Sequence, residues 1–254
     1  EGENTIIGQE LYQSQNLYIQ ITSFRQDNSD VYVADIYLRS MDCLQRGFAG
    51  GKWKKTQAKV RVIAQDNYAV MAMTGDNSQN FTAGWVVANG NILRKTKNSK
   101  RDLCLIYRTG EMVTLKAAQI DHKKITDEMD QLWQSFLFGP VLLDENGKAM
   151  TKFNTNVGPA NPRSVIGYYE PGHYCLVQVD GRRTESRLEK GKINVGMTMK
   201  QTSALMEQLG CAAAYNLDGG QSSVLWYNGE NLSNPYNGGR NVMDAVLILD
   251  GAVN

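Results

Sequence analysis

The alternation of apolar and polar residues predicts a chain built mainly from β-hairpins. Residues 16–24 and 31–38 each alternate with a period of two, and the polar residues 25–30 between them form a turn. Short turns that contain glycine separate several other pairs of apolar runs in the same way. The hairpins predicted from these patterns are 16–24 with 31–38, 85–93 about Asn89-Gly90, 103–107 with 112–115, 165–169 with 174–179, and a last one about Asn228-Gly229.

Helical patterns are few. Residues 56–65 can form a short helix, and residues 126–138 carry the first good helical pattern. Thr198-Met-Lys-Gln201 has the spacing of a capping box, in which two side chains satisfy the first backbone N–H groups of a helix. A helix is therefore predicted over 198–209, and Gly210 is a suitable residue to end it.

Uninterrupted apolar runs supply further strands, and glycine-rich stretches supply loops. The run Cys211 to Leu217 is typical of a buried strand, and so are residues 68–73, 138–143 and 245–249. Residues 41–55 contain several glycines and a Lys/Trp cluster, which indicates a loop.

Together these elements predict an α+β fold, in one domain of mixed, mostly antiparallel sheets with a few helices and an active cleft at the strand ends. The domain is expected over residues 16–254. Residues 1–15 are expected to be a disordered or frayed N-terminal segment, because the chain begins with polar residues and termini are often poorly ordered.

Composition places the chain among ordinary globular proteins and argues against two classes of partner. It has 254 residues, of which 42% are hydrophobic and 21% charged, and 27 Lys and Arg balance 26 Asp and Glu. With almost no net charge, nucleic acid and anionic membrane surfaces are not expected partners. The chain starts at Glu1 without a methionine, so a removed signal peptide or N-terminal anchor is expected, and membrane contact only through such an anchor.

Cysteine and histidine spacing gives no support to a metal site. Cys43, Cys104, Cys175 and Cys211 contain no CxxC pair, and the chain has only two histidines, so neither a zinc site nor a cofactor is predicted. The last three cysteines lie in apolar strand-like runs, where free cysteine behaves as a small hydrophobic residue. Buried thiols are therefore expected rather than disulfides or catalytic cysteines.

The stretch Asn216-Leu-Asp-Gly-Gly-Gln-Ser-Ser223 is the most informative part of the chain for function. A buried strand ends at Asp218, and two glycines allow a ligand to approach the backbone closely. Successive N–H groups in such a turn can form an anion-binding nest, to which Ser222 and Ser223 add hydroxyl donors. The alternative is a tight turn in which Asp218 only caps its own backbone.

Several strands end in a polar residue beside glycine, which suggests that these ends converge on one pocket. Carboxylates, arginines and an N–H nest together suit a reaction on an anionic sugar derivative, since arginine offers bidentate phosphate contacts and carboxylates serve glycosidic cleavage. The residues at these strand ends are Asp76, Arg163, Asp180 with Arg182, and Asp218 with its Gly-Gly-Gln-Ser-Ser.

Three motifs together resemble the phosphodiester glycosidase family. They are Asn161-Pro-Arg-Ser-Val-Ile-Gly167, Val179-Asp-Gly-Arg182, and Gly196-Met-Thr-Met199 followed by the helix and the 216–223 stretch, in the family's order. The similarity covers roughly residues 30–250. Two positions depart from the family pattern: Thr74-Gly75-Asp76-Asn77 in place of an Asn-Gly-Gly/Asp-Phe sequence, and Gln221 in place of a third glycine.

The resemblance implies hydrolysis of a sugar-1-phosphodiester at the anomeric carbon. A phosphomonoester leaves readily because its second pKa is about 6, so a strong general acid is not required. Asp180 and Asp218 are the candidates for nucleophile or base. The other residues implied in the site are Asp76 and Arg240 as supporting members, Arg163 and Arg182 at the phosphate, and Asn216, Ser164, Gly219, Gly220, Gln221, Ser222 and Ser223 at the substrate.

The sequence leaves several alternatives open. Asp180 and Asp218 could each only brace a turn or orient an arginine. The domain could instead be a non-catalytic module that binds cell-surface glycans, with Trp53, Trp85 and Tyr236 as stacking platforms. The substrate implied by the resemblance is an α-GlcNAc-1-phosphodiester or a wall or capsule glycopolymer, and the implied location is outside the cytoplasm, secreted or anchored at a bacterial surface.

Overall fold

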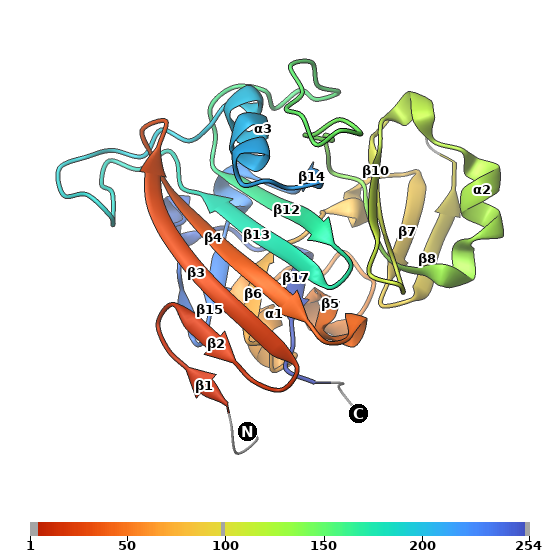
Figure 1. Ribbon diagram of the computed structural model, residues 1–254, viewed down its shortest axis with the longest axis horizontal. Coiled ribbons are helices and arrows are strands. Elements are labelled where there is room, and N and C mark those ends of the chain that lie inside the picture. Colours follow the sequence, from red (N-terminus) through yellow and green to blue (C-terminus); the bar gives the residue numbers. More distant parts are fainter. Residues whose placement is uncertain (1–4, 98–99, 252–254) are drawn as a thin grey trace.

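Two antiparallel sheets that pack face to face form the centre of the molecule (Figure 1). The protein is described here by a computed structural model, which covers residues 5–97 and 100–251. The neighbouring strands within each sheet are antiparallel. Together with the few helices, this arrangement confirms the predicted α+β class.

The larger sheet has the strand order β1 (Ile6–Ile7), β2 (Leu11–Gln13), β3 (Leu17–Gln26), β4 (Ser29–Leu38), β13 (His173–Val179), β12 (Arg163–Glu170) and β14 (Ala213–Asn216). The second sheet has the order β16 (Glu230–Asn231), β15 (Leu225–Tyr227), β6 (Met71–Thr74), β17 (Asp244–Ile248) and β5 (Leu44–Phe48).

The main hydrophobic core fills the space between these two sheets. Ile19 and Ile36 of the larger sheet and Met73 and Val246 of the second sheet are fully buried in one cluster. Burial of several large side chains from each sheet, at about 1.5–3 kcal/mol for each, is what holds the two sheets together.

One helix covers the outer face of each sheet. Helix α3 (Met199–Gln208) packs on the larger sheet through Leu205 and Met206. Helix α1 (Val60–Asp66) packs on the second sheet through Ile63. The molecule is therefore layered as helix, sheet, sheet and helix.

Two small sheets and a helix form a separate group at one side of the molecule (Figure 1). They are β7 (Gly84–Ala88) paired with β8 (Asn91–Thr96), β9 (Leu103–Tyr107) between β10 (Met112–Leu115) and β11 (Leu132–Phe136), and helix α2 (His122–Asp127). This group has its own hydrophobic cluster, in which Leu105 and Leu132 are buried.

Elements with local signals form as predicted. The hairpins β3–β4, β7–β8, β9–β10 and β12–β13 are all present. The capping box is present too: the Thr198 hydroxyl accepts the Gln201 N–H at 3.3 Å, and the Gln201 side chain accepts the Thr198 N–H at 2.9 Å. Gly210 follows the helix with a φ of 78°, in the left-handed region that glycine tolerates.

The predicted helix over 126–138 is wrong for most of its length. Helix α2 ends at Asp127, and residues 132–136 form β11, which pairs with β9. All five residues of β11 are buried, so both faces of the strand are covered and its residues show no alternation that would distinguish it from a helix.

Three other segments also differ from their predicted structure. Within residues 1–15, β1 and β2 pair with each other and β2 pairs with β3, so the described part of this segment is not frayed. Within the predicted loop 41–55, β5 pairs with β17. Residues 138–143 form only isolated bridges at Val141 and Leu143 instead of a continuous strand.

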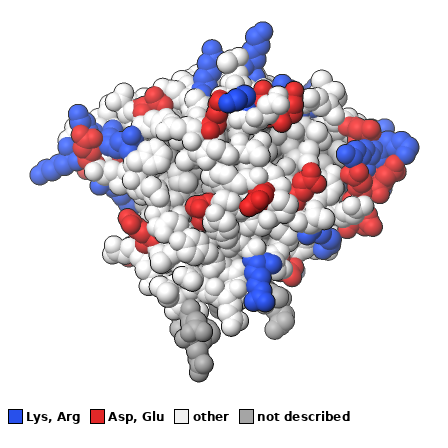
Figure 2. Space-filling model, viewed as in Figure 1, with Lys and Arg blue, Asp and Glu red and all other residues white. Residues whose placement is uncertain are grey.

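Charged side chains of both signs are interspersed on the face of the molecule seen in Figure 2. This mixture agrees with the nearly balanced numbers of basic and acidic residues in the chain. The face in view therefore presents neither a broad basic surface nor a broad acidic one.

Candidate active site

A cleft of about 370 Å³ lies where β12 begins and β14 ends, beside the 219–221 turn. Of the predicted site residues, those that line it are Arg163, Arg182, Asn216, Asp218, Gly219, Gly220, Gln221 and Arg240. Residues from four separate segments of the chain thus meet at the strand ends, as the sequence predicted.

The 216–223 stretch forms a tight turn whose backbone is fixed by hydrogen bonds to two other segments of the chain. Gly220 donates its N–H to the Pro162 carbonyl at 3.0 Å, and Asp218 donates its N–H to the Gly75 carbonyl at 3.1 Å. A Cβ on Gly219 would lie 2.8 Å from the Pro162 carbonyl oxygen, so only glycine fits at this position.

The predicted anion nest is not formed in this turn. The Gly219 N–H is donated to the Asp218 carboxylate at 2.9 Å, and those of Ser222 and Ser223 are donated to backbone carbonyls within the turn. A nest requires N–H groups that point together at an anion, and these donors already have partners. We therefore expect phosphate binding to rely mainly on side chains.

The three predicted serines lie beneath the cleft instead of lining it. Ser164, Ser222 and Ser223 are all buried. The Ser222 hydroxyl accepts a hydrogen bond from Arg240 Nε at 2.5 Å, and the Ser164 and Ser223 hydroxyls lie 3.3 Å apart. These hydroxyls hold the turn in place, and none of the three serines is among the residues that line the cleft.

An ion pair between Asp218 and Arg240 stands at one side of the cleft. Arg240 Nη2 lies 3.4 Å from Asp218 Oδ2, and the Asp218 residue is only 6% exposed while the arginine side chain is 52% exposed. Burial raises the pKa of the Asp218 carboxyl, and the hydrogen bond from Ser222 and the charge of Arg240 oppose that rise. Asp218 is thus a carboxylate at the cleft, close to the half-exposed positive charge of Arg240.

Arg182 lies across the cleft on the turn that follows β13. Its φ of 55° is left-handed, which is unusual for arginine and turns the side chain back towards the cleft. The guanidinium donates to the Asn161 side-chain oxygen and lies 5.7 Å above the Tyr236 ring. These two contacts orient the guanidinium while leaving other N–H groups to bind a ligand.

Arg163 contributes a buried positive charge at the floor of the cleft. Its Nε donates to the Met197 carbonyl at 2.9 Å and its Nη2 donates to the carbonyls of Gly158 and Pro159. Burial, together with the nearby charge of Arg182, lowers the pKa of Arg163 to about 10. The group remains protonated at neutral pH, and it also fixes the 157–161 segment that lines the cleft.

Asn216 presents an acceptor that has no partner. Its Nδ2 donates to the Gly139 carbonyl at 2.8 Å, which sets the orientation of the amide. Its Oδ1 is buried and makes no hydrogen bond within the protein. A buried polar atom without a partner costs about 1–3 kcal/mol, so a ligand donor at this position would recover free energy.

Asp76 and Asp180 were predicted as members of the site, but neither lines the cleft in the described part of the chain. Asp76 is fully buried and accepts the N–H groups of Leu137 and Phe138, each at 2.7 Å. Asp180 is 1% exposed and accepts the Asn234 N–H at 2.9 Å. Each carboxylate holds a loop that borders the cleft, so each has a bracing role.

The pKa values of both carboxyls reflect this burial. Burial raises the pKa of Asp76 to about 6, although the charge of Arg46 opposes the rise. Burial raises the pKa of Asp180 to about 7, although the Asn234 N–H opposes the rise. A perturbed pKa is frequent at catalytic sites, but here burial is its largest cause for both carboxyls.

A second chamber of about 630 Å³ continues from the cleft. The two share Asn77, Asp218, Gln221 and Arg240 as lining residues. The remaining residues of the chamber are Gln57, Lys59, Asn80, Asn237, Gly239, Asn241 and Val242. The chamber is thus lined mainly by side-chain amides, and Asp218 is the one carboxylate among the described residues that line either space.

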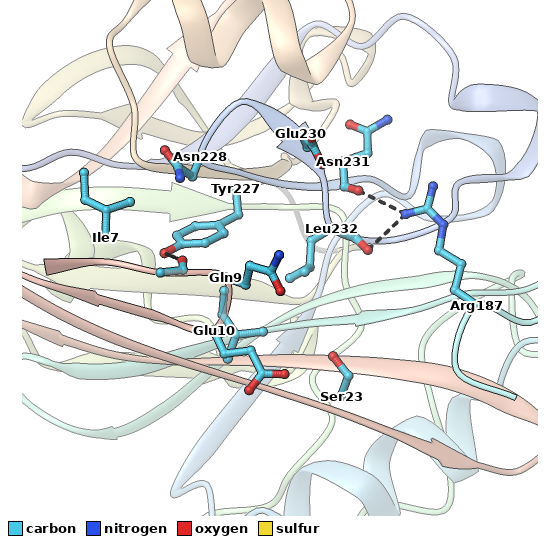
Figure 3. A pocket seen from close by; sticks show the side chains of 12 residues that line it. Ile7, Gln9, Glu10, Ser23, Arg187, Tyr227, Asn228, Glu230, Asn231 and Leu232 are labelled. Atoms are coloured by element: carbon cyan, nitrogen blue, oxygen red, sulfur yellow. Dashed lines mark hydrogen bonds between the residues drawn. The ribbon is translucent and has the colours of Figure 1, made fainter.

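Another pocket, of about 610 Å³, lies between β1–β2 and β15–β16 (Figure 3). Arg187 points to its edge but already donates to the carbonyls of Asn231 and Leu232. The Tyr227 hydroxyl donates to the Gly8 carbonyl at 2.8 Å. None of the predicted site residues lines this pocket, so the cleft at Asp218 is the better candidate.

Comparison with known families identifies the fold and its relatives. The phosphodiester glycosidase family matches residues 60–249 of this chain. The chain belongs to the phosphodiester glycosidase family. A search of curated protein sequences found no match.

Solved structures show that this phosphodiester glycosidase domain shares its fold with distant relatives. It is similar to the catalytic domain of zebrafish N-acetylglucosamine-1-phosphodiester alpha-N-acetylglucosaminidase, auto-inhibited by its pro-peptide, with 18% identity, a TM-score of 0.71, and coverage of 98% of this chain and 88% of that one. It is also similar to a hypothetical protein from Synechocystis, with 13% identity, a TM-score of 0.61, and coverage of 92% of this chain and 62% of that one.

A third similar structure is a Burkholderia pseudomallei protein considered to be exported, with 14% identity, a TM-score of 0.60, and coverage of 87% of this chain and 74% of that one. No helix in the described part of this family member is long and apolar enough to cross a membrane. Within the same residues, no group of three or more His, Cys, Asp or Glu side chains could hold a metal ion.

Four residues that line the cleft of this family member were missed from the sequence. They are Asn77, Phe138, Val157 and Asn161. Asn161 opens one of the family motifs and Asn77 follows the Gly75-Asp76 strand end, so both positions carried a signal. Phe138 and Val157 are apolar residues in stretches without a motif, and only the folded chain places them at the cleft.

One of the three stacking platforms proposed for glycan binding, Trp85, is not available in this fold. Trp85 is 3% exposed, and its ring nitrogen is bonded to His122 Nδ1 at 3.0 Å. Trp53 packs edge-on against Phe48, with the ring centroids 5.5 Å apart. Tyr236 lies beside Arg182 at the cleft itself.

Proposed function

We propose that this protein hydrolyses a sugar-1-phosphodiester, releasing the free sugar and a phosphomonoester. The observation that carries the proposal is the cleft in which Asp218 and Arg240 face Arg182, with the unpaired Asn216 acceptor beside them. Membership in the phosphodiester glycosidase family supports the same reaction.

Arginines would bind the phosphate of the substrate. Arg182 and Arg240 line the cleft from different segments, and Arg163 adds a buried positive charge at its floor. Guanidinium groups form bidentate hydrogen bonds with phosphate oxygens, and their strength increases where water is excluded. The arginines would also stabilise the extra negative charge on the phosphate as it leaves.

Asn216 would bind the sugar. Its free Oδ1 is an acceptor, and a phosphate diester has no proton to donate to it. A sugar hydroxyl or acetamido N–H supplies the missing donor. We therefore propose that the sugar lies next to Asn216 and the phosphate next to the arginines.

Asp218 would act as the general base in the reaction. It is the carboxylate that lines the cleft among the described residues, and burial raises the pKa of its carboxyl, which makes it a stronger base. Asp218 would take a proton from a water molecule whose oxygen bonds to the anomeric carbon. The bond between that carbon and the phosphate oxygen breaks, and its electron pair leaves with the phosphomonoester.

The second chamber, which is lined mainly by side-chain amides, is the proposed binding site of the aglycone, the group on the far side of the phosphate. Side-chain amides both donate and accept hydrogen bonds, which suits neighbouring hydroxyl groups. No aromatic ring is among the described residues that line this chamber, so a nucleobase would find no stacking partner there. We therefore propose a hydroxyl-rich aglycone, as in a glycopolymer, in preference to a nucleotide. Such polymers lie at cell surfaces, so the proposed site of action is outside the cytoplasm.

Sugar release by the purified protein tests the proposed function. The substrates are UDP-GlcNAc and a GlcNAc-α-1-phosphodiester whose aglycone is a sugar alcohol, and free GlcNAc is measured. We expect faster release from the second substrate, and a loss of at least about 100-fold in kcat for Asp218→Asn, as for removal of a general base. The exposed Asp127→Asn is the matched control and should retain full activity.

The outcomes are distinct. Equal release by wild type and Asp218→Asn would remove Asp218 from the reaction. Saturable binding of the same compounds without release of sugar by any variant would instead support the glycan-binding module.

A further inference from the structure

Two of the four cysteines meet inside the molecule. The sulfur atoms of Cys175 and Cys211 lie 3.7 Å apart, and both residues are buried in the cluster between the larger sheet and α3. Cys43 and Cys104 are buried in a different cluster. The sequence alone gave no reason to pair any of the four.

Gly167 makes the close approach of the two sulfurs possible. It lies opposite Cys175 in the β12–β13 pair. A Cβ at this position would lie 2.6 Å from the sulfur of Cys175 and 2.8 Å from that of Cys211. The two thiols therefore occupy space that any other residue at 167 would fill.

The two cysteines differ in their access to a reagent. Cys175 is at the centre of the larger sheet, since β13 lies between β4 and β12. Cys211 follows the end of α3 directly after Gly210, and a Cβ on that glycine would meet no atom within 4 Å. Opening the few residues at the end of α3 would thus expose Cys211 without opening the sheet.

We propose that Cys175 and Cys211 form a disulfide when the protein meets a small disulfide oxidant or a thiol oxidase. The sulfurs must approach by roughly 1.7 Å to reach the ordinary S–S bond length of about 2.05 Å, which side-chain rotation and small backbone shifts can provide. Oxidising compartments outside the cytoplasm supply such oxidants. The inference does not depend on the proposed hydrolase activity.

The reaction proceeds through two thiol–disulfide exchanges. The Cys211 thiolate attacks one sulfur of the oxidant, and the other half of the oxidant leaves as a thiol. The Cys175 thiol then loses its proton and attacks the Cys211 sulfur, releasing the second thiol. Two electrons pass to the oxidant, and the two protons of the cysteines end on the released thiols.

The electrostatics favour Cys211 as the first nucleophile. Hydrogen bonds from the Cys175 thiol and then from Tyr169 lower the pKa of the Cys211 thiol, against the effect of burial. The same hydrogen bond, together with burial, raises the pKa of Cys175. A lower pKa gives a larger fraction of the reactive thiolate.

The cross-link would join two parts of the chain that reach the cleft. Cys175 is on β13, which leads to Arg182, and Cys211 precedes β14, which leads to Asn216 and Asp218. Closing the loop formed by residues 176–210 restricts the unfolded chain. Because the unfolded chain loses conformational entropy, we expect the disulfide to raise the Tm of a domain of this size by about 5–10 °C.

Intact mass and thermal unfolding test the proposal on the folded wild-type protein. The protein is incubated under native conditions with oxidised glutathione or with dithiothreitol, alkylated, and measured by mass spectrometry. We expect oxidation to lower the mass by about 2 Da before alkylation, to link the Cys175 and Cys211 peptides, and to raise Tm. Cys43→Ala and Cys104→Ala should behave as wild type, while Cys175→Ala and Cys211→Ala should not form the link.

The wild-type measurement decides the question even if a variant fails to fold. A protein that keeps four alkylatable thiols after prolonged oxidation in the folded state would overturn the proposal. So would a glutathione adduct that stays on Cys211, or a link that includes Cys43 or Cys104.

Discussion

At the scale of single residues, the molecule separates carboxylates that line the cleft from carboxylates that hold its walls. Asp218 lines the cleft beside Arg240, whereas Asp180 is buried and accepts the backbone N–H of Asn234. Both carboxyls have raised pKa values because both are buried. The difference in role follows from what each carboxylate touches and not from its pKa.

Asp180 therefore gives a prediction about pH and stability. Its pKa is near 3.8 when the chain is unfolded and about 7 when it is folded, because burial disfavours the charged form. A raised folded pKa means that the stability from this group is fully present below about pH 4 and is lost as the pH rises through about 7. Asp180→Asn stays neutral, so its stability relative to wild type should increase between pH 4 and pH 8 by up to roughly 4 kcal/mol.

Urea unfolding of both proteins at pH 4, 6 and 8 measures this difference, with Asp127→Asn as the exposed control. Sugar release by Asp180→Asn at pH 8 should remain close to that of wild type. A stability difference that does not change with pH would contradict the raised pKa of Asp180. A complete loss of sugar release in the folded variant would contradict its purely structural role.

At the scale of elements, the sequence predicts best those elements whose ends are fixed by hydrogen bonds between residues close together in the chain. Helix α3 is the clearest case, since Thr198 and Gln201 cap each other and Gly210 ends the last turn. This helix precedes β14, and β14 carries the chain into the Asp218 turn. The start of α3 therefore helps to position the site.

Thr198→Ala removes the side-chain cap of α3. We expect a loss of about 1 kcal/mol in the free energy of unfolding, because the Gln201 N–H loses its acceptor. Tm should fall by about 2–4 °C. Thr198→Ser keeps the hydroxyl and is the matched control, so an equal loss in both variants would mean that packing of the threonine methyl group, rather than the cap, is responsible.

At the scale of the whole molecule, a buried charge network joins the second sheet to the smaller sheets. Arg46 on β5 bonds to Asp244 at 2.7 Å and lies 3.5 Å from Asp76. It also donates to the Ser135 carbonyl of β11 at 3.0 Å. Asp76 in turn accepts two backbone N–H groups that precede the cis Gly139-Pro140 bond, and so connects the network to the cleft wall.

Arg46→Met should be strongly destabilising. It leaves two buried carboxylates without their positive partner, which costs about 3–5 kcal/mol in the free energy of unfolding. Denaturant unfolding measures the loss, and the exposed Arg61→Met is the control. Adding Asp76→Asn and Asp244→Asn should recover part of the loss, and a triple variant as unstable as the single one would contradict an electrostatic cause.

The sequence by itself determined the features that depend on neighbours along the chain. Hairpins with short polar turns, the capping box at Thr198 and the family motifs can all be recognised within a few residues, because their hydrogen bonds and turn geometry are local. The cleft residues Arg163, Arg182 and Asp218 were identified in this way, and so was the α+β class.

Only the tertiary structure decided what each strand end faces. Asp76 and Asp180 have the same local pattern as Asp218, a carboxylate beside glycine after a strand, yet they brace buried loops. The strand β11 was taken for a helix because it is buried on both faces. The thiols of Cys175 and Cys211 come together because Gly167 has no side chain to fill the space between them. The burial and the direction of a side chain depend on segments far away in the sequence, so no local pattern predicts them.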